Sequence, residues 1–124
     1  VNEATVTGFE FSTMTKTLVE AGKLTGLKVY SRKEGDQYFR QSDNLALAEA
    51  GVPAHTMGVA FGFPDYHDVG DEWQKIDYPN MAKVDRTVAV GLWEIANDAK
   101  APEWKASNPK TKPYIDAAAK LHPR

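Results

Sequence analysis

The chain alternates short stretches of strand-like composition with stretches of helical periodicity, and this alternation limits the folds it can adopt. The strand candidates are residues 4–10, 27–30 and 52–57. Each is followed by a segment whose apolar residues recur at helical spacing. The order strand, helix, strand, helix, strand, helix predicts an α/β fold, with a layered, mostly parallel sheet and flanking helices.

Residues that begin and end helices mark the first two helical segments. Ser12 is the expected N-cap of a helix over residues 13–24. Ser42 or Asp43 is expected to cap a second, shorter helix, and Gly51 is well placed to end it in a left-handed conformation.

The longest helix is predicted to begin at Asn80 as its N-cap. Its expected apolar face consists of Met81, Val84, Val88, Leu92 and Ile95. We therefore divide the chain into a main portion, residues 1–100, and a proline-broken tail, residues 101–124, with a weak helical pattern over 114–121.

Composition excludes several classes of function. The 124 residues suit one domain, and the net charge of −2 gives no basic surface for nucleic acid or an anionic membrane. The absence of cysteine excludes disulfides and thiolate chemistry. Three strands are few for a parallel sheet, and the chain opens at Val1 rather than methionine. We therefore expect it to be part of a larger domain.

A long Gly-, Pro- and Asp-rich connection, residues 58–79, holds the chemistry-bearing residues. His67 lies there among four acidic residues: Asp65, Asp68, Asp71 and Glu72. An imidazole beside carboxylates suits a zinc ligand whose second N–H a carboxylate accepts, and Asp68 or Asp71 could accept it. The residues alone favour a surface ion-pair histidine, because zinc sites need three or four protein ligands. A calcium site is disfavoured because the EF-hand glycine and glutamate are missing.

Four short motifs change this balance. They are residues 39–44 (FRQSDN), 50–54 (AGVPA), 64–67 (PDYH) with Asp71, and 75–78 (KIDY). In this order and at these separations, they resemble the C-terminal half of the di-zinc aminopeptidase family, which includes bacterial leucyl aminopeptidases and glutamate carboxypeptidase-like enzymes. The resemblance covers residues 4–98 and implies a zinc-exopeptidase, phosphorylase/hydrolase-like fold.

The resemblance assigns roles to individual residues. His67 matches the family's last metal ligand, and Asp71 matches the aspartate that orders the loop after it. Ser42 and Asp43 match the pair that lines the substrate pocket, and Asn44 stands where many relatives have histidine. Tyr66 is a further pocket candidate, as an oxyanion donor or as an anchor of its loop.

The remaining metal ligands of the family and its general base have no match in this chain. Residues 1–66 contain no H-x-D sequence and no Glu-Glu pair, and the other histidines, His55 and His122, lack ligand spacing to His67. We interpret His55 as a structural histidine with satisfied ring nitrogens.

The resemblance thus implies a fragment of a zinc-dependent aminopeptidase, inactive alone, whose parent binds two zinc ions and a peptide substrate. It also implies a missing N-terminal half, self-association of the fragment, and a periplasmic or extracellular location. The alternative is a non-catalytic binding or interaction domain on the same scaffold.

Overall fold

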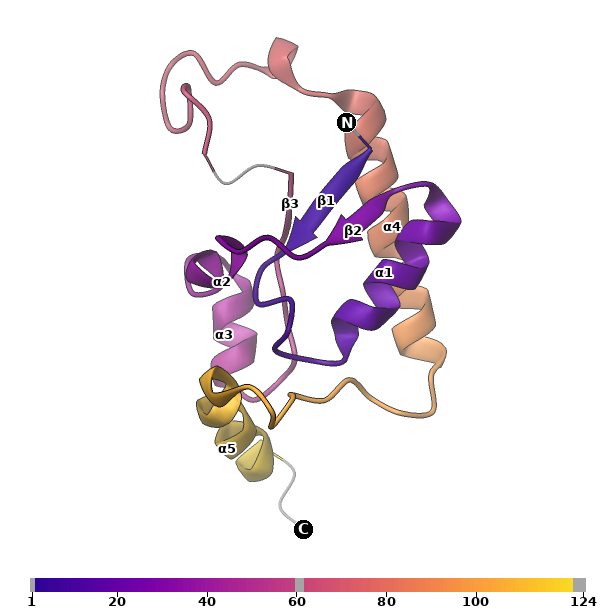
Figure 1. Ribbon diagram of the computed structural model, residues 1–124, viewed down its shortest axis with the longest axis vertical. Helices are drawn as coiled ribbons and strands as arrows, with labels where there is room; N and C mark the ends of the chain where they lie inside the picture. Colours follow the sequence, from indigo (N-terminus) through magenta and orange to yellow (C-terminus); the bar gives the residue numbers. More distant parts are fainter. Residues whose placement is uncertain (1, 60–61, 122–124) are drawn as a thin grey trace.

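The computed structural model describes residues 2–59 and 62–121, and Figure 1 shows their arrangement. In chain order the elements are β1 (Glu3–Val6), α1 (Met14–Thr25), β2 (Lys28–Tyr30), α2 (Gly35–Tyr38), α3 (Asn44–Glu49), β3 (Met57–Gly58), the 3₁₀ helix η1 (Trp73–Lys75), α4 (Tyr78–Asn97), the 3₁₀ helix η2 (Pro109–Thr111) and α5 (Lys112–Leu121). This confirms the α/β class. Helices α1 and α3 begin within about two residues of their predicted starts, whereas α4 begins three residues earlier than predicted.

The sheet is mixed, so the prediction of a mostly parallel sheet is wrong for the part that the structure describes. Its order is β2-β1-β3, with β1 parallel to β2 and antiparallel to β3. The direction of β3 follows from hydrogen bonds just past the end of β1. Thr7 N donates to Thr56 O, and Thr56 N donates to Thr7 Oγ1. The chain therefore enters β3 beside the carboxyl end of β1 and runs back along it.

Helices α1 and α4 pack on each other beside the sheet (Figure 1). The first core cluster lies between them and the strands; it contains Ala4, Val6, Leu18, Leu27 and Val29.

The face of α4 that meets α1 differs in part from the predicted one, although Val84 packs against the first core cluster as expected. It is built on Thr87 and Gly91, which are buried, whereas Met81 is 45% and Leu92 60% exposed. Small residues occupy the contact because the helices approach closely: a Cβ on Gly91 would lie 2.8 Å from Leu18 Cδ2.

Two helix caps differ from the predicted ones. Thr13, not Ser12, is the N-cap position of α1, and Asp77, not Asn80, caps α4 by accepting from Asn80 N at 3.0 Å. Asn80 is buried instead, and its side-chain amide bonds to both the N–H and the carbonyl of Glu3. A pattern of residue types cannot separate these roles, because an Asn near a helix start suits both a cap and a link to a strand end.

A second core cluster joins the C-terminal segment to the rest of the molecule. It contains Phe11, Phe39, Ala48, Trp104 and Tyr114. Trp104 Nε1 donates to Gly51 O at 2.9 Å, and α5 packs on α3. The segment after residue 100 is therefore packed structure over its described part. Within residues 2–59 and 62–121, no helix has the length and hydrophobicity needed to cross a bilayer.

Candidate functional site

The acidic loop, residues 62–77, projects from the molecule between β3 and α4, at the opposite end of the long axis from α5 (Figure 1). Three successive turns shape it: Tyr66 N donates to Phe63 O, Asp68 N to Asp65 O and Asp71 N to Asp68 O, at 2.9–3.1 Å. For residues 62–76, every hydrogen bond and ion pair found among the described residues stays within residues 62–78. The loop is therefore held by its own contacts.

His67 lies in the middle of this loop and is exposed. Its φ of 61° makes it the non-glycine residue with a left-handed backbone in the described part of the chain. The Tyr66 and His67 rings stack with centroids 4.0 Å apart. Neither ring nitrogen of His67 has a hydrogen-bond partner within residues 2–59 and 62–121, so both are open to a metal ion. A solvent-facing neutral imidazole fits the donor type that zinc prefers.

The acidic residues around His67 do not form a ligand set with it. Asp68 Oδ1 accepts from Val69 N at 2.7 Å, and Asp65 pairs with Lys75. The backbone N–H of Asp71 donates to Asp68 O in the third of the turns. In the described part of the chain, no group of three or more His, Asp or Glu side chains is close enough to hold a metal ion. The predicted role of Asp71, to order the loop after His67, therefore stays a prediction.

The predicted pocket segment, residues 39–44, lies below the loop in Figure 1, beside α2 and α3. Ser42 and Asp43 are exposed there. Asn44 is buried, and its amide donates to Phe39 O at 3.0 Å and accepts from Thr56 Oγ1 at 2.9 Å. Among the described residues, no hydrogen bond joins this segment to the His67 loop.

His55 makes two side-chain contacts that sequence patterns did not reveal. Its Nδ1 lies 2.8 Å from Thr7 O and its Nε2 lies 2.6 Å from Ser12 Oγ. Because a carbonyl only accepts, Nδ1 carries the proton and Nε2 accepts from the Ser12 hydroxyl. Ser12 is fully buried, so this pair is a structural link between β1, α1 and β3 and not an exposed nucleophile. The other remaining histidine, His122, lies outside the described residues.

Burial lowers the pKa of His55 below its usual value, with the Lys105 charge adding to the effect and the Thr7 hydrogen bond opposing it. Near neutral pH the ring is uncharged in both the folded and the unfolded chain. As the pH falls below about 6.5, the unfolded chain takes up a proton that the folded chain resists, so stability falls. We expect the free energy of unfolding, from urea titrations, to decrease between about pH 7 and pH 5.

A His55→Gln variant, which has no group that titrates in this range, is the control. Its stability should be lower at pH 7 but nearly independent of pH over the same interval. An equal decrease in both proteins would assign the pH dependence to other groups.

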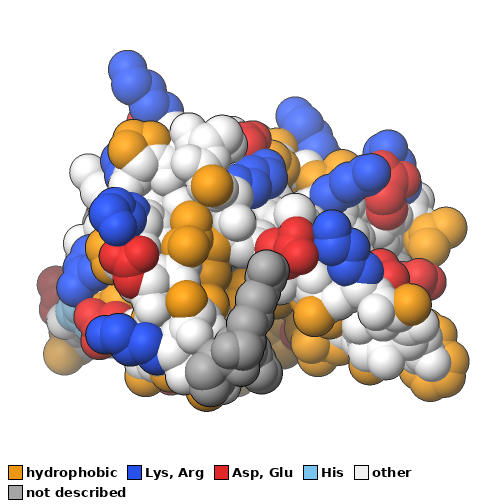
Figure 2. All heavy atoms as spheres, turned by 90° about the horizontal axis from the view of Figure 1, so that it is seen from below, with side chains coloured by type: hydrophobic (Ala, Val, Ile, Leu, Met, Phe, Trp, Pro, Cys, Tyr) orange, Lys and Arg blue, Asp and Glu red, His pale blue; other side chains and the backbone are white. Residues whose placement is uncertain are grey.

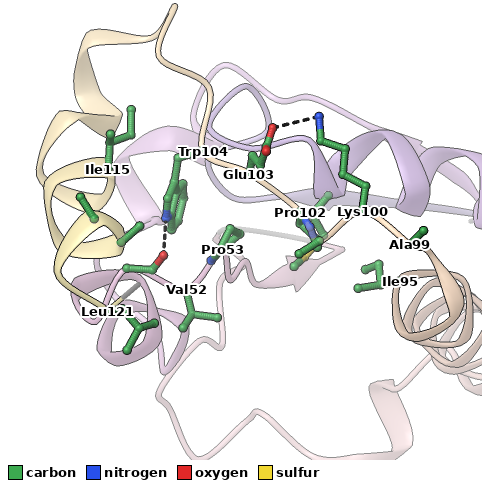
Figure 3. A pocket seen from close by; sticks show the side chains of 15 residues that line it. Val52, Pro53, Ile95, Ala99, Lys100, Pro102, Glu103, Trp104, Ile115 and Leu121 are labelled. Carbon is green, nitrogen blue, oxygen red and sulfur yellow. Dashed lines mark hydrogen bonds and ion pairs between the residues drawn. The ribbon is translucent and has the colours of Figure 1, made fainter. Parts of the chain in front are cut away.

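An apolar groove lies at the α5 end of the molecule, with a volume of about 1060 Å³ (Figure 3). Its walls include Pro53, Pro102, Trp104 and Ile115, and Figure 2 shows hydrophobic side chains gathered on this end face among charged ones. Lys100 and Glu103 on its lining pair with each other at 3.2 Å. The groove therefore offers burial for an apolar group, and the described residues that line it present no unpaired charge for acid–base or metal chemistry.

Comparison with known protein families identifies the family to which this chain belongs. The described residues form a small mixed α/β fold that carries an exposed histidine on an acidic loop. The model of the family described as Peptidase family M28 matches residues 4–92, which is more than half of the 124 residues and includes the His67 loop. The chain therefore belongs to peptidase family M28, whose members generally depend on zinc. No curated protein and no solved structure matches the chain significantly.

Proposed function

We propose that this chain is the C-terminal part of a zinc-dependent aminopeptidase that hydrolyses peptide bonds near a free N-terminus. The observation that carries the proposal is the family match across the acidic loop, together with the exposure and unpaired ring nitrogens of His67. In this proposal His67 supplies one ligand of a zinc pair, and the remaining ligands and the general base come from sequence upstream.

The residues of this chain would have distinct tasks in that enzyme. Zinc, when bound, would polarise the scissile carbonyl and lower the pKa of a bound water. His67 would hold one ion through a neutral ring nitrogen, and Asp71 would keep the loop in order. Ser42 and Asp43, both exposed, would line the pocket for the N-terminal residue. Asn44 would support that pocket from behind, because its amide is already bonded to Phe39 and Thr56.

A single histidine holds zinc weakly, so we expect the isolated chain to be inactive. The test uses a protein extended upstream to include the remaining ligands, assayed for zinc content and for cleavage of aminoacyl p-nitroanilides. His67→Ala should lower zinc occupancy of one site and reduce kcat/KM by more than about 100-fold, because even the outer partners of metal ligands are worth 10–100-fold.

Val69→Ala, on the same loop, is the matched control and should be near wild type, since that side chain is 93% exposed. Retention of zinc and activity by His67→Ala would overturn the proposal. If zinc binds but no peptide substrate is cleaved, the alternative of a non-catalytic binding domain on this scaffold gains support.

Exposed apolar side chains support the proposal of a surface that binds another protein segment. Trp73, Leu92 and Trp93 are each at least 60% exposed, on η1 and α4. We propose that the upstream half of the domain covers this surface in the parent enzyme, and that the isolated chain self-associates through it. By the resemblance to exported aminopeptidases, the parent enzyme is proposed to act in the periplasm or outside the cell.

A further inference from the structure

We propose that Asp65 and Lys75 are positioning residues that hold the His67 loop in the conformation in which His67 can bind a metal ion. This inference rests on the proposed function, since it concerns the residue assigned there as a zinc ligand. It goes beyond that function by assigning a role to two residues that do not contact the metal.

The Asp65–Lys75 ion pair closes the loop around His67. Lys75 Nζ on η1 donates to Asp65 Oδ2, which joins the start of the turn series to its end. Both members of this ion pair lie within residues 62–77. Asp65 is also the partly buried carboxylate of the loop, whereas Asp68, Asp71 and Glu72 are exposed.

The other carboxylate oxygen of Asp65 packs against the inner side of the loop. A Cβ placed on Gly70 would lie 2.9 Å from Asp65 Oδ1. The carboxylate thus sits between Gly70 on one side and the Lys75 ammonium on the other. At the same time, the Asp65 carbonyl accepts from Asp68 N at 2.9 Å, so the backbone and side chain of one residue fix both flanks of His67.

The backbone conformation of His67 explains why the Asp65–Lys75 ion pair is needed. A left-handed conformation is unfavourable for a residue with a Cβ, and it persists only where the surroundings hold it. Every hydrogen bond and ion pair of residues 62–76 found among the described residues stays within residues 62–78, so these internal links are the polar contacts that hold the loop. An exposed ion pair adds little to global stability, so its removal should loosen the loop without unfolding the chain.

The first arm of the experiment uses the 124-residue chain without metal. Asp65→Asn, Lys75→Met and Gly70→Ala should each speed amide exchange at Asp68 and Asp71 by about three- to tenfold, while the thermal midpoint stays close to wild type. Gly70→Ala removes no charge and acts by displacing the Asp65 carboxylate. Glu72→Gln is the matched control, because it removes an exposed loop charge that has no ion pair among the described residues. The double exchange of Asp65→Lys with Lys75→Asp should restore slow exchange.

The second arm measures zinc affinity in the upstream-extended protein. Asp65→Asn and Lys75→Met should weaken zinc binding by about 10–100-fold, as expected for residues that orient a ligand. Loop exchange no faster in Asp65→Asn than in Glu72→Gln would overturn the inference, and so would a loosened loop with unchanged zinc affinity. His67→Ala in the same protein tests the proposed function separately: if it leaves zinc binding unchanged, the ligand assignment fails, whatever the loop exchange shows.

Discussion

Replacing Gly51 by alanine should destabilise the chain by about 2–5 kcal/mol, or prevent α5 from docking. Gly51 has φ of 92°, a conformation that costs a residue with a Cβ about 1–2 kcal/mol. The new Cβ would also lie 2.3 Å from Ala118 N and 2.5 Å from Ala118 Cα. These are backbone atoms of α5, so no rotamer change can relieve the clash, and overpacking adds about 1–3 kcal/mol.

The measurement is the free energy of unfolding by urea, with Trp104 fluorescence as a reporter of α5 docking. Gly26→Ala is the matched control. Gly26 also has a positive φ, 75°, but nothing lies within 4 Å of its would-be Cβ. It should therefore show the conformational cost alone, about 1 kcal/mol. Equal losses in the two variants would mean that α5 does not rest on Gly51 in solution.

Truncating Phe39 should cost about 3–5 kcal/mol, because its side chain is the centre of the second core cluster. The ring is 1% exposed and lies 4.8 Å from the Phe11 ring, 5.6 Å from that of Tyr114 and 6.3 Å from that of Trp104, measured between centroids. Phe39→Ala would leave a cavity among side chains from three distant parts of the chain. Differential scanning calorimetry should show a melting temperature lower by more than about 10 °C.

The comparison variant for Phe39 is Trp93→Ala. Trp93 is larger but 68% exposed on α4, so its removal should change stability by less than about 0.5 kcal/mol. A small effect of Phe39→Ala would mean that the second cluster is not formed, and that the segment after residue 100 does not pack as the structure has it.

The local parts of the fold were predictable because their signals are local. The helical spacing before Gly26 and Gly51 predicted α1 and α3, and Gly51 has the left-handed backbone that ends α3. The direction of β3 was not predictable, because it follows from bonds between Thr7 and Thr56, which are far apart in sequence. The contact face of α4 was also missed, because apolar spacing cannot show that a close helix pair selects Thr87 and Gly91.

The candidate site divides in the same way. The sequence motifs singled out His67 and its loop, and the family match includes both. The structural tasks of Asn44 and His55 needed the fold, because their hydrogen-bond partners are backbone groups and hydroxyls whose positions no motif encodes. The pairing of Asp65 with Lys75 likewise needed the path of the loop, since any of four acidic residues there could have met that lysine.

By itself the sequence determined the α/β class and the approximate positions of the main helices, and it singled out His67 and its loop, because periodicity, helix-ending glycines and motif order are properties of neighbouring residues. The tertiary structure alone decided the mixed sheet, the packing of residues 101–121 through Trp104 and Tyr114, and the shape of the loop around His67. These depend on which distant groups satisfy one another's hydrogen bonds and volumes, and that is settled only when the chain is folded.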